Sequence, residues 1–149
     1  MVAIRAARPD DARLWCEMRR ALWPEGSTDE HAREIEGFFA GRSREPLAVL
    51  VAEVAPDQLL GFAELSIRPF AEGCTTDRVG YLEGWYVIPE ARGQGVGRSL
   101  VEAAEVWARA QGCTEFASDV EAGNELSAAA HRALGFTDVL VIRCFRKDL

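Results

Sequence analysis

Residues 81–112 contain the pattern that most constrains the fold: an apolar strand, a glycine-rich turn and an amphipathic helix in direct succession. Aromatic and β-branched residues dominate the strand, and Pro89 ends it because proline lacks the N–H group that a sheet requires. After the turn, apolar residues recur at the spacing of one helix face: Leu100, Ala103, Ala104 and Trp107. A helix start offers unpaired N–H groups and the positive end of a dipole. The pattern therefore predicts an anion site, in which Gly93, Gly95 and Gly97 leave room for a phosphate group.

The residues around these glycines narrow the kind of site. A nucleoside-triphosphate loop needs four residues between its glycines and a lysine before Ser or Thr, whereas Arg98 precedes Ser99 here. The dinucleotide fingerprint also fails, because Leu100 stands where its third glycine belongs. The residues instead match the pattern Arg-x-x-Gly-x-Gly, which begins at Arg92. The side chain of Arg92 adds a charged hydrogen-bond donor beside the turn. The alternative is a glycine-rich surface turn that binds nothing.

Length and composition predict one globular domain over residues 1–149, with 48% hydrophobic and 28% charged residues. The four cysteines are far apart and form no metal or redox motif with the two histidines, so we expect reduced thiols and no metal. We see neither a signal peptide nor a membrane span and expect a cytoplasmic protein that binds no membrane. An excess of 24 acidic over 17 basic residues opposes nucleic-acid binding and favours cationic partners.

Hydrophobic periodicity and turn residues predict a mixed α/β fold with the order β-α-α-β-β-β-α-β-α-β-β. The remaining strands are predicted at residues 2–7, 47–54, 59–67 and 115–119, with one or two more within 137–145. Two helices are predicted between the first two strands, and another at 124–134. The predicted buried faces comprise Leu14, Trp15, Met18 and Leu22, then Ile35, Phe38 and Phe39, and in the last helix Leu126, Ala130 and Leu134. A long loop, residues 68–78, could reach over a neighbouring site.

The glycine-rich turn and the order of elements resemble the GCN5-related N-acetyltransferases (GNAT), which hold acetyl-coenzyme A (acetyl-CoA) by its pyrophosphate at such a turn. Four further motifs resemble the aminoglycoside 6′-N-acetyltransferases: Leu22-Trp23-Pro24, Leu82-Glu83-Gly84, Ala117-Ser118-Asp119 and Ala133-Leu134-Gly135-Phe136. That family acetylates the 6′-amine of aminoglycoside antibiotics directly from acetyl-CoA. The resemblance implies a single-domain mixed sheet of the GNAT type, an antibiotic-resistance enzyme and a homodimer.

The resemblance also assigns binding residues. Those expected to contact acetyl-CoA are Trp85, Tyr86, Val87, Arg92, Gly93, Gln94, Gly95, Val96, Gly97 and Asn124. Trp23, Glu83 and Asp119 are expected to contact the aminoglycoside. Phe70 is a candidate for covering the substrate from its own or a partner subunit. The alternatives are a core role for Trp23, an outward-facing Glu83, a capping or turn role for Asp119 and a loop anchor at Phe70.

Two residues are candidates for catalysis. A carboxylate such as Glu83, at the open end of the cofactor strand, can neutralise the amine before it attacks the thioester. His131 stands where many GNAT members carry a tyrosine that protonates the leaving thiolate, and a histidine can do this near neutral pH. The alternative for His131 is a surface or satisfied core residue.

No residue lies in a Gly-x-Ser-x-Gly nucleophile motif, so we expect direct transfer in a ternary complex without an acyl-enzyme. Two other functions are open: acetylation of another small amine, such as a polyamine or a protein N-terminus, and non-catalytic sensing of acyl-CoA. The pair of Glu83 and Asp119 favours an enzyme that acts on cations, because a sensor needs neither carboxylate.

Overall fold

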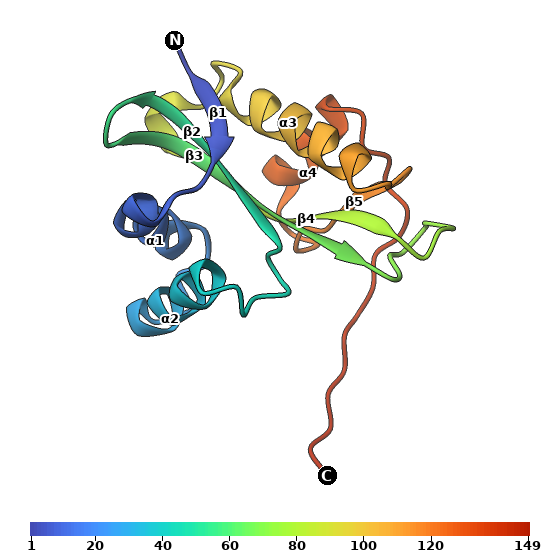
Figure 1. The fold of residues 1–149 in the computed structure, drawn as a ribbon. Helices are drawn as coiled ribbons and strands as arrows, with labels where there is room; N and C mark the ends of the chain where they lie inside the picture. The colour runs from blue at the N-terminus through green and yellow to red at the C-terminus, as the bar shows by residue number, and fades with distance from the viewer.

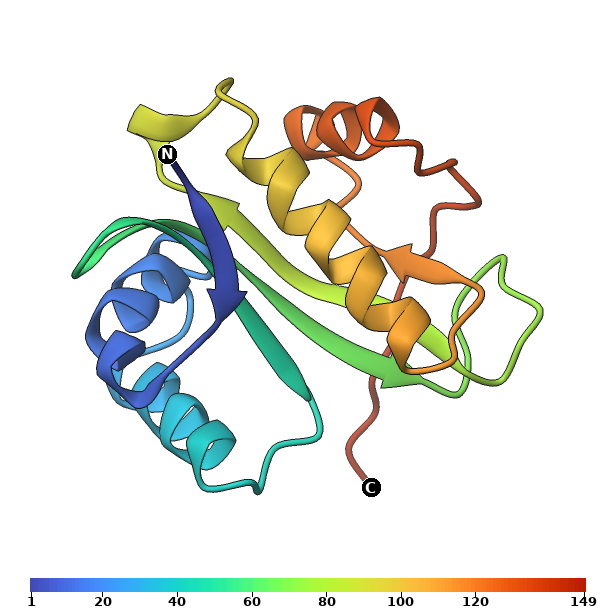
Figure 2. The ribbon, with the colours of Figure 1, turned by 45° about the horizontal axis from the view of Figure 1, so that its top comes forward.

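A five-stranded sheet lies between two layers of helices in the computed structural model, which describes residues 1–149 (Figures 1 and 2). The strands are β1 (Ala3–Ala6), β2 (Ala48–Ala55), β3 (Gln58–Arg68), β4 (Val79–Val87) and β5 (Phe116–Ser118). They lie in sequence order, with β1 to β4 antiparallel and β5 parallel to β4. The helices are α1 (Ala12–Leu22) and α2 (Thr28–Phe39) on one face, with α3 (Val96–Ala110) and α4 (Glu125–Ala133) on the other. Short 3-10 turns, Pro9–Asp11 and Pro89–Ala91, precede α1 and follow β4.

Each face of the sheet carries its own apolar core. Trp15 of α1 and Phe62 of β3 are fully buried in one core, while Leu100 of α3 is fully buried in the other. The periodicity that predicted these helices is confirmed, and Ser27 and Glu30 form the capping box that starts α2. Burial of the apolar faces therefore fixes which side of the sheet each helix pair covers.

A β-bulge interrupts β4 at Glu83. On β3, Glu64 pairs with Gly84 while the next residue, Leu65, pairs with Leu82, so Glu83 is an extra residue in the ladder. Bulges of this kind bend a strand and change where its side chains point. Leu82 accordingly packs in the α3 core, whereas Gly84 contacts a side chain from α1. Glu83 thus lies where the alternation of side chains between the two faces of the sheet is shifted along β4.

Beyond the bulge, β4 runs on without β5. The two strands pair only from Gly80 and Phe116 to Leu82 and Ser118, and β4 continues to Val87. The edge of β4 that would face a longer β5 therefore has no strand partner along residues 83–87. This open edge leads from the end of β5 toward the turn that starts α3.

Two predictions at the C-terminal end are wrong. Residues 137–145 form no strand; they follow an extended path away from the sheet, and residues 137–149 make no backbone hydrogen bond within the chain (Figure 1). No residue of α4 is buried, and Leu126 is 79% exposed although it was predicted on the buried face. A strand needs a neighbour to satisfy its N–H and C=O groups, and the chain offers this segment none. Because β5 is only three residues long, α4 has little sheet to cover.

No helix in the structure is both long and apolar enough to cross a membrane.

Candidate functional site

The turn before α3, residues 92–97, has the geometry of an anion site. Gly93 and Gly95 have φ angles of +77° and +86°, a region that other L-residues rarely adopt. The first bond of the helix is donated by the N–H of Ser99 to the carbonyl of Gly95, at 3.0 Å. The N–H groups of residues 93–98 have no partner within the chain. This phosphate turn therefore presents a row of free donors at the positive end of a helix dipole.

Side chains fix the phosphate turn to the end of β4. The indole N–H of Trp85 donates to the carbonyl of Gly97 at 3.2 Å, and a Cβ atom at Gly97 would lie 3.0 Å from that ring. Arg92 donates through Nε to the carbonyl of Val87 at 2.9 Å, and its guanidinium lies 5.5 Å from the ring centroid of Tyr86. The positive charge of Arg92 is thus held beside the free N–H groups, as the sequence predicted, while the carbonyl of Val87 is already occupied.

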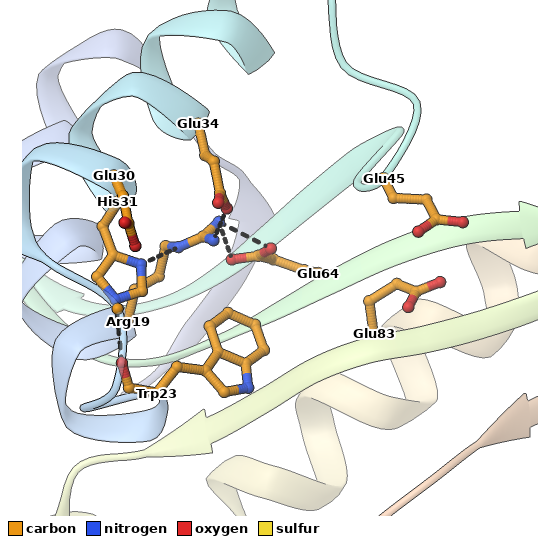
Figure 3. A pocket seen from close by; sticks show the side chains of 9 residues that line it. Arg19, Trp23, Glu30, His31, Glu34, Glu45, Glu64 and Glu83 are labelled. Atoms are coloured by element: carbon orange, nitrogen blue, oxygen red, sulfur yellow. Dashed lines mark hydrogen bonds and ion pairs between the residues drawn. The ribbon is translucent and has the colours of Figure 1, made fainter. Parts of the chain in front are cut away.

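An acidic pocket of about 350 Å³ lies between the α1–α2 pair and the sheet (Figure 3). Five carboxylates face it with one guanidinium and one histidine; the lining residues are Arg19, Trp23, Gly26, Glu30, His31, Glu34, Glu45, Glu64 and Glu83. Such an excess of negative charge in a concave site favours cationic ligands. The pocket brings together Trp23 and Glu83 as predicted, but Asp119 and Phe70 are not part of its lining.

Glu83 is already paired inside this pocket. Its carboxylate accepts hydrogen bonds from the hydroxyl of Ser66 and from Arg68, whose Nη2 and Nε lie 2.6 and 2.9 Å away. The guanidinium of Arg68 lies 3.6 Å from the ring centroid of Tyr81. Glu83 therefore faces a polar site, which excludes the outward-facing alternative. A cationic ligand would share this carboxylate with Arg68.

Asp119 and Phe70 lie outside the acidic pocket. Asp119 is exposed and accepts a hydrogen bond from the hydroxyl of Tyr81. Burial and this bond raise the pKa of Tyr81, so the phenol stays protonated. Asp119 is thus linked to Glu83 only through Tyr81 and Arg68. Phe70 is 63% exposed, which does not fit a buried loop anchor.

His131 lies where β5 parts from β4. Its Nδ1 donates to the carbonyl of Ser127 at 2.7 Å, so the proton of a neutral ring is on Nδ1 and Nε2 accepts from the hydroxyl of Ser118 at 2.8 Å. The ring packs edge-on against Trp85, with centroids 5.2 Å apart. His131 is therefore half-buried and hydrogen-bonded at both nitrogens. Asn124 caps α4 through its side-chain oxygen, which accepts from the N–H of Ser127 at 3.1 Å.

Several polar residues of these sites were not predicted, among them Arg19, His31, Glu64, Arg68 and Ser118. Two of them had a signal in the sequence. Arg19 comes four residues after Trp15, so it lies on the buried face of α1 where an apolar residue is expected. Glu64 interrupts an apolar strand in the same way. A charge at a position that the pattern assigns to the core indicates a buried polar cluster.

Comparison with known proteins agrees with this geometry. The profile of the Acetyltransferase (GNAT) family matches residues 12–136. Aminoglycoside N(6′)-acetyltransferase type 1 of Klebsiella aerogenes is 56% identical over 147 residues, which cover 98% of this chain and 96% of that protein. The enzyme of the same name from Stenotrophomonas maltophilia is 40% identical, covering 98% and 93%. The solved structure of AAC(6′)-Iy in complex with the bisubstrate analogue CoA-S-monomethyl-acetylneamine superposes with a TM-score of 0.90 at 32% identity, covering 100% and 99%.

The buried carboxyl of Glu64 predicts a pH dependence of stability. Burial raises its pKa from 4.5 to about 7, while Arg19 and Trp15 act in the opposite direction. Because the folded-state pKa is raised, the contribution of this group to stability is full below about pH 4.5 and is lost as the pH rises through about 7. We expect a loss of up to about 3 kcal/mol across this range from Glu64.

The measurement is a ¹³C NMR titration of glutamate carboxyls, with the signal assigned by Glu64→Gln. A midpoint near 7 is expected in the wild type and in the control variant Glu36→Gln, whose glutamate is exposed on α2. A midpoint below 5 for Glu64 would contradict this environment.

Proposed function

Because this chain belongs to the acetyltransferase (GNAT) family, we propose that it transfers the acetyl group of acetyl-CoA to the 6′-amine of aminoglycoside antibiotics and so confers resistance to them. The observation that carries this proposal is the position of the two sites. The phosphate turn follows the C-terminal end of β4, and the acidic pocket includes Glu83 from the middle of the same strand. A cation in the pocket and an acyl donor on the phosphate turn would therefore meet along one strand.

The residues around β4 fit acetyl-CoA. The free N–H groups of residues 93–98 and the guanidinium of Arg92 suit its phosphates, and a Cβ atom at Gly93 or Gly95 would meet nothing within 4 Å. The edge of β4 at residues 85–87 has no strand partner and suits an extended chain with amide groups, although Arg92 already occupies the carbonyl of Val87. Asn124 can contribute its amide nitrogen, since its oxygen caps α4. When bound, acetyl-CoA supplies the activated acetyl group.

The residues of this chain then orient the amine and manage protons. Glu83 accepts a hydrogen bond from the ammonium group and takes up its proton, which leaves a neutral amine to attack the thioester. Trp23 forms a wall of the pocket, and Asp119 extends the negative field. Ser118 and His131 share a proton between Oγ and Nε2 at the end of β5. We propose that the hydroxyl proton of Ser118 passes to the thiolate that leaves, while His131 in its imidazolium form donates its Nε2 proton to Oγ of Ser118 and becomes the neutral ring with its proton on Nδ1. This gives His131 the role of the acid through Ser118.

Initial rates of thiol release from acetyl-CoA test the function. We expect thiol release from acetyl-CoA in the presence of aminoglycosides that carry a 6′-amine. Matched aminoglycosides with a 6′-hydroxyl should cause no release by acetylation at the 6′ position. Release with a polyamine or a peptide N-terminus alone would favour acetylation of another small amine. Binding of acetyl-CoA without release by any amine would favour an acyl-CoA sensor. The five carboxylates of the pocket favour a ligand with several positive charges over a peptide N-terminus or a sensor that binds acyl-CoA alone, and the relative rates separate the aminoglycoside from the polyamine.

Cellular setting and assembly are part of the same proposal. All four cysteines are free, which supports a protein that works in the reducing cytoplasm. A single sheet with a core on each face supports one domain over residues 1–149. The extended segment of residues 137–149, the C-terminal arm, supports a homodimer. Its apolar side chains are exposed, among them Val139 (59%), Val141 (81%) and Phe145 (91%). A run that is apolar on both faces is typical of an interior strand, so we propose that the arm pairs with a second copy of the chain.

The first prediction of this proposal concerns the phosphate turn. Gly95→Val places a side chain where phosphate approaches the backbone, so we expect the KM for acetyl-CoA to rise at least about tenfold and the KM for the amine to change little. Gly41→Val is the matched control, because Gly41 also has a positive φ of +73° and open space around it. An unchanged KM for acetyl-CoA in folded Gly95→Val would contradict the site.

The second prediction concerns the acidic pocket. Glu83→Gln removes a charge-assisted hydrogen bond of about 1.5–3 kcal/mol, so the KM for aminoglycosides should rise by one to two decades. Asp119→Asn should have a smaller effect because Asp119 is exposed, and Glu36→Gln on α2 should have none. Added salt should weaken aminoglycoside use by the wild type. Equal activity of Glu83→Gln and the wild type at low and high salt would exclude a cation site at Glu83.

The third prediction concerns the C-terminal arm. Light scattering after gel filtration should give twice the 16.4 kDa mass of the chain. Val141→Lys should shift the protein to the monomer, because a charge cannot be buried in a strand interface without a partner. Leu126→Lys, at an exposed apolar residue of α4, is the control and should remain dimeric. A monomeric wild type, or a dimer that survives Val141→Lys, would contradict pairing through the arm.

A further inference from the structure

A buried cation lies among the carboxylates of the acidic pocket. Arg19 of α1 is 4% exposed and shares a helix face with Trp15. Its guanidinium lies 5.9 Å from the ring centroid of Trp15. A charge inside a protein is costly unless every donor finds a partner, and in a pocket for cations it also repels the ligand. Arg19 must therefore have a role that offsets both the cost of burying its charge and its repulsion of a cationic ligand.

Arg19 donates hydrogen bonds from each of its three nitrogens (Figure 3). Nη1 donates to both carboxylate oxygens of Glu64, at 3.0 Å each, and Nη2 donates to Glu34. Nε donates to Nδ1 of His31 at 3.2 Å. The guanidinium thus connects α1 to α2 and to β3 in fixed directions. A lysine ammonium, which is a point charge, cannot reproduce this planar fork.

His31 connects Arg19 to the backbone of the turn that follows α1. Because the Nε of arginine is always a donor, Nδ1 of His31 is unprotonated, and Nε2 carries the proton that it donates to the carbonyl of Trp23 at 3.1 Å. That carbonyl also accepts from the N–H of Gly26 at 3.3 Å. The turn lies so close to the imidazole that a Cβ atom at Gly26 would be 2.9 Å from Nε2. The backbone of Trp23 is therefore held at one place.

Arg19 also holds the side chain of Trp23. Its guanidinium carbon lies 5.0 Å from the indole centroid, within the range of a cation–π interaction. The indole lies against Gly84 of β4, where a Cβ atom would be 2.5 Å from the ring. Trp23 is thus confined between Arg19 and β4, one residue along the strand from Glu83.

We propose that Arg19 is the positioning residue of the substrate pocket: through His31 and its own contact with the indole, it fixes Trp23 as the wall against which the aminoglycoside binds. This inference rests on the proposed function. Arg19 forms no hydrogen bond or ion pair with Glu83 or with the phosphate turn, so its loss changes the fit of the amine substrate and not the binding of acetyl-CoA.

Arg19→Lys tests this directly, because it keeps a positive charge beside Glu64 and removes the bond to His31 and the planar contact with Trp23. We expect the KM for aminoglycosides to rise about tenfold, with the KM for acetyl-CoA unchanged. Arg20→Lys, at the exposed neighbouring residue, is the control. A lower melting temperature with unchanged KM values would make Arg19 a residue of stability alone and overturn the proposal.

A double-mutant cycle tests whether Arg19 acts on substrate binding through Trp23. In a Trp23→Ala background, Arg19→Lys should cause little further loss, whereas additive losses would overturn the proposal. His31→Phe keeps the pair of Arg19 and Glu64 and should raise the same KM, so the test does not depend on one variant folding. ¹⁹F NMR of fluorotryptophan-labelled protein gives a readout without activity: the Trp23 signal should shift or broaden in Arg19→Lys. If the wild type uses no aminoglycoside, the proposed function fails, and this signal still tests the role of Arg19.

Discussion

One extra residue in β4 allows a single strand to serve both sites. The bulge at Glu83 shifts the alternation of side chains, so that Leu82 packs under α3 while Gly84 faces α1. Past the bulge, β4 loses β5 as a neighbour, and its edge has no strand partner as far as the phosphate turn. A regular strand paired along its full length would close that edge and direct Glu83 differently. The acidic pocket and the proposed acetyl-CoA site therefore depend on the same local irregularity.

Arginine side chains of the protein pair with the carboxylates of the acidic pocket and stabilise them. Each of the two carboxylates on the sheet has one arginine partner: Glu64 pairs with Arg19, and Glu83 with Arg68. Arg19 lowers the pKa of Glu64, although burial raises it by more. Glu34, at the rim, has a side chain that is 58% exposed and pairs with Nη2 of Arg19. The pocket thus keeps a net negative charge for a polycation while its floor is held rigid by internal ion pairs.

The sequence predicted the parts of the site that depend on local patterns. A strand, three glycines and a helix face are contiguous, so the phosphate turn and its place after β4 followed from spacing alone. The acidic pocket did not, because Arg19, His31 and Glu64 come from three elements that only the packed core brings together. The arginine partner of Glu83 was missed for the same reason. At the C-terminus, the apolar pattern predicted strands that the structure does not contain, because a pattern cannot show that the chain offers this segment no neighbouring strand.

The central claim is that an amine in the acidic pocket and an acyl donor on the phosphate turn meet at β4. A crystal structure with coenzyme A and an aminoglycoside tests it most directly. We expect coenzyme A phosphates on the N–H groups of residues 93–98, the antibiotic against Trp23, and its 6′-nitrogen beside Glu83 at the open edge of β4. An antibiotic bound elsewhere on the surface, or with its 6′-nitrogen directed away from that edge, would contradict the account.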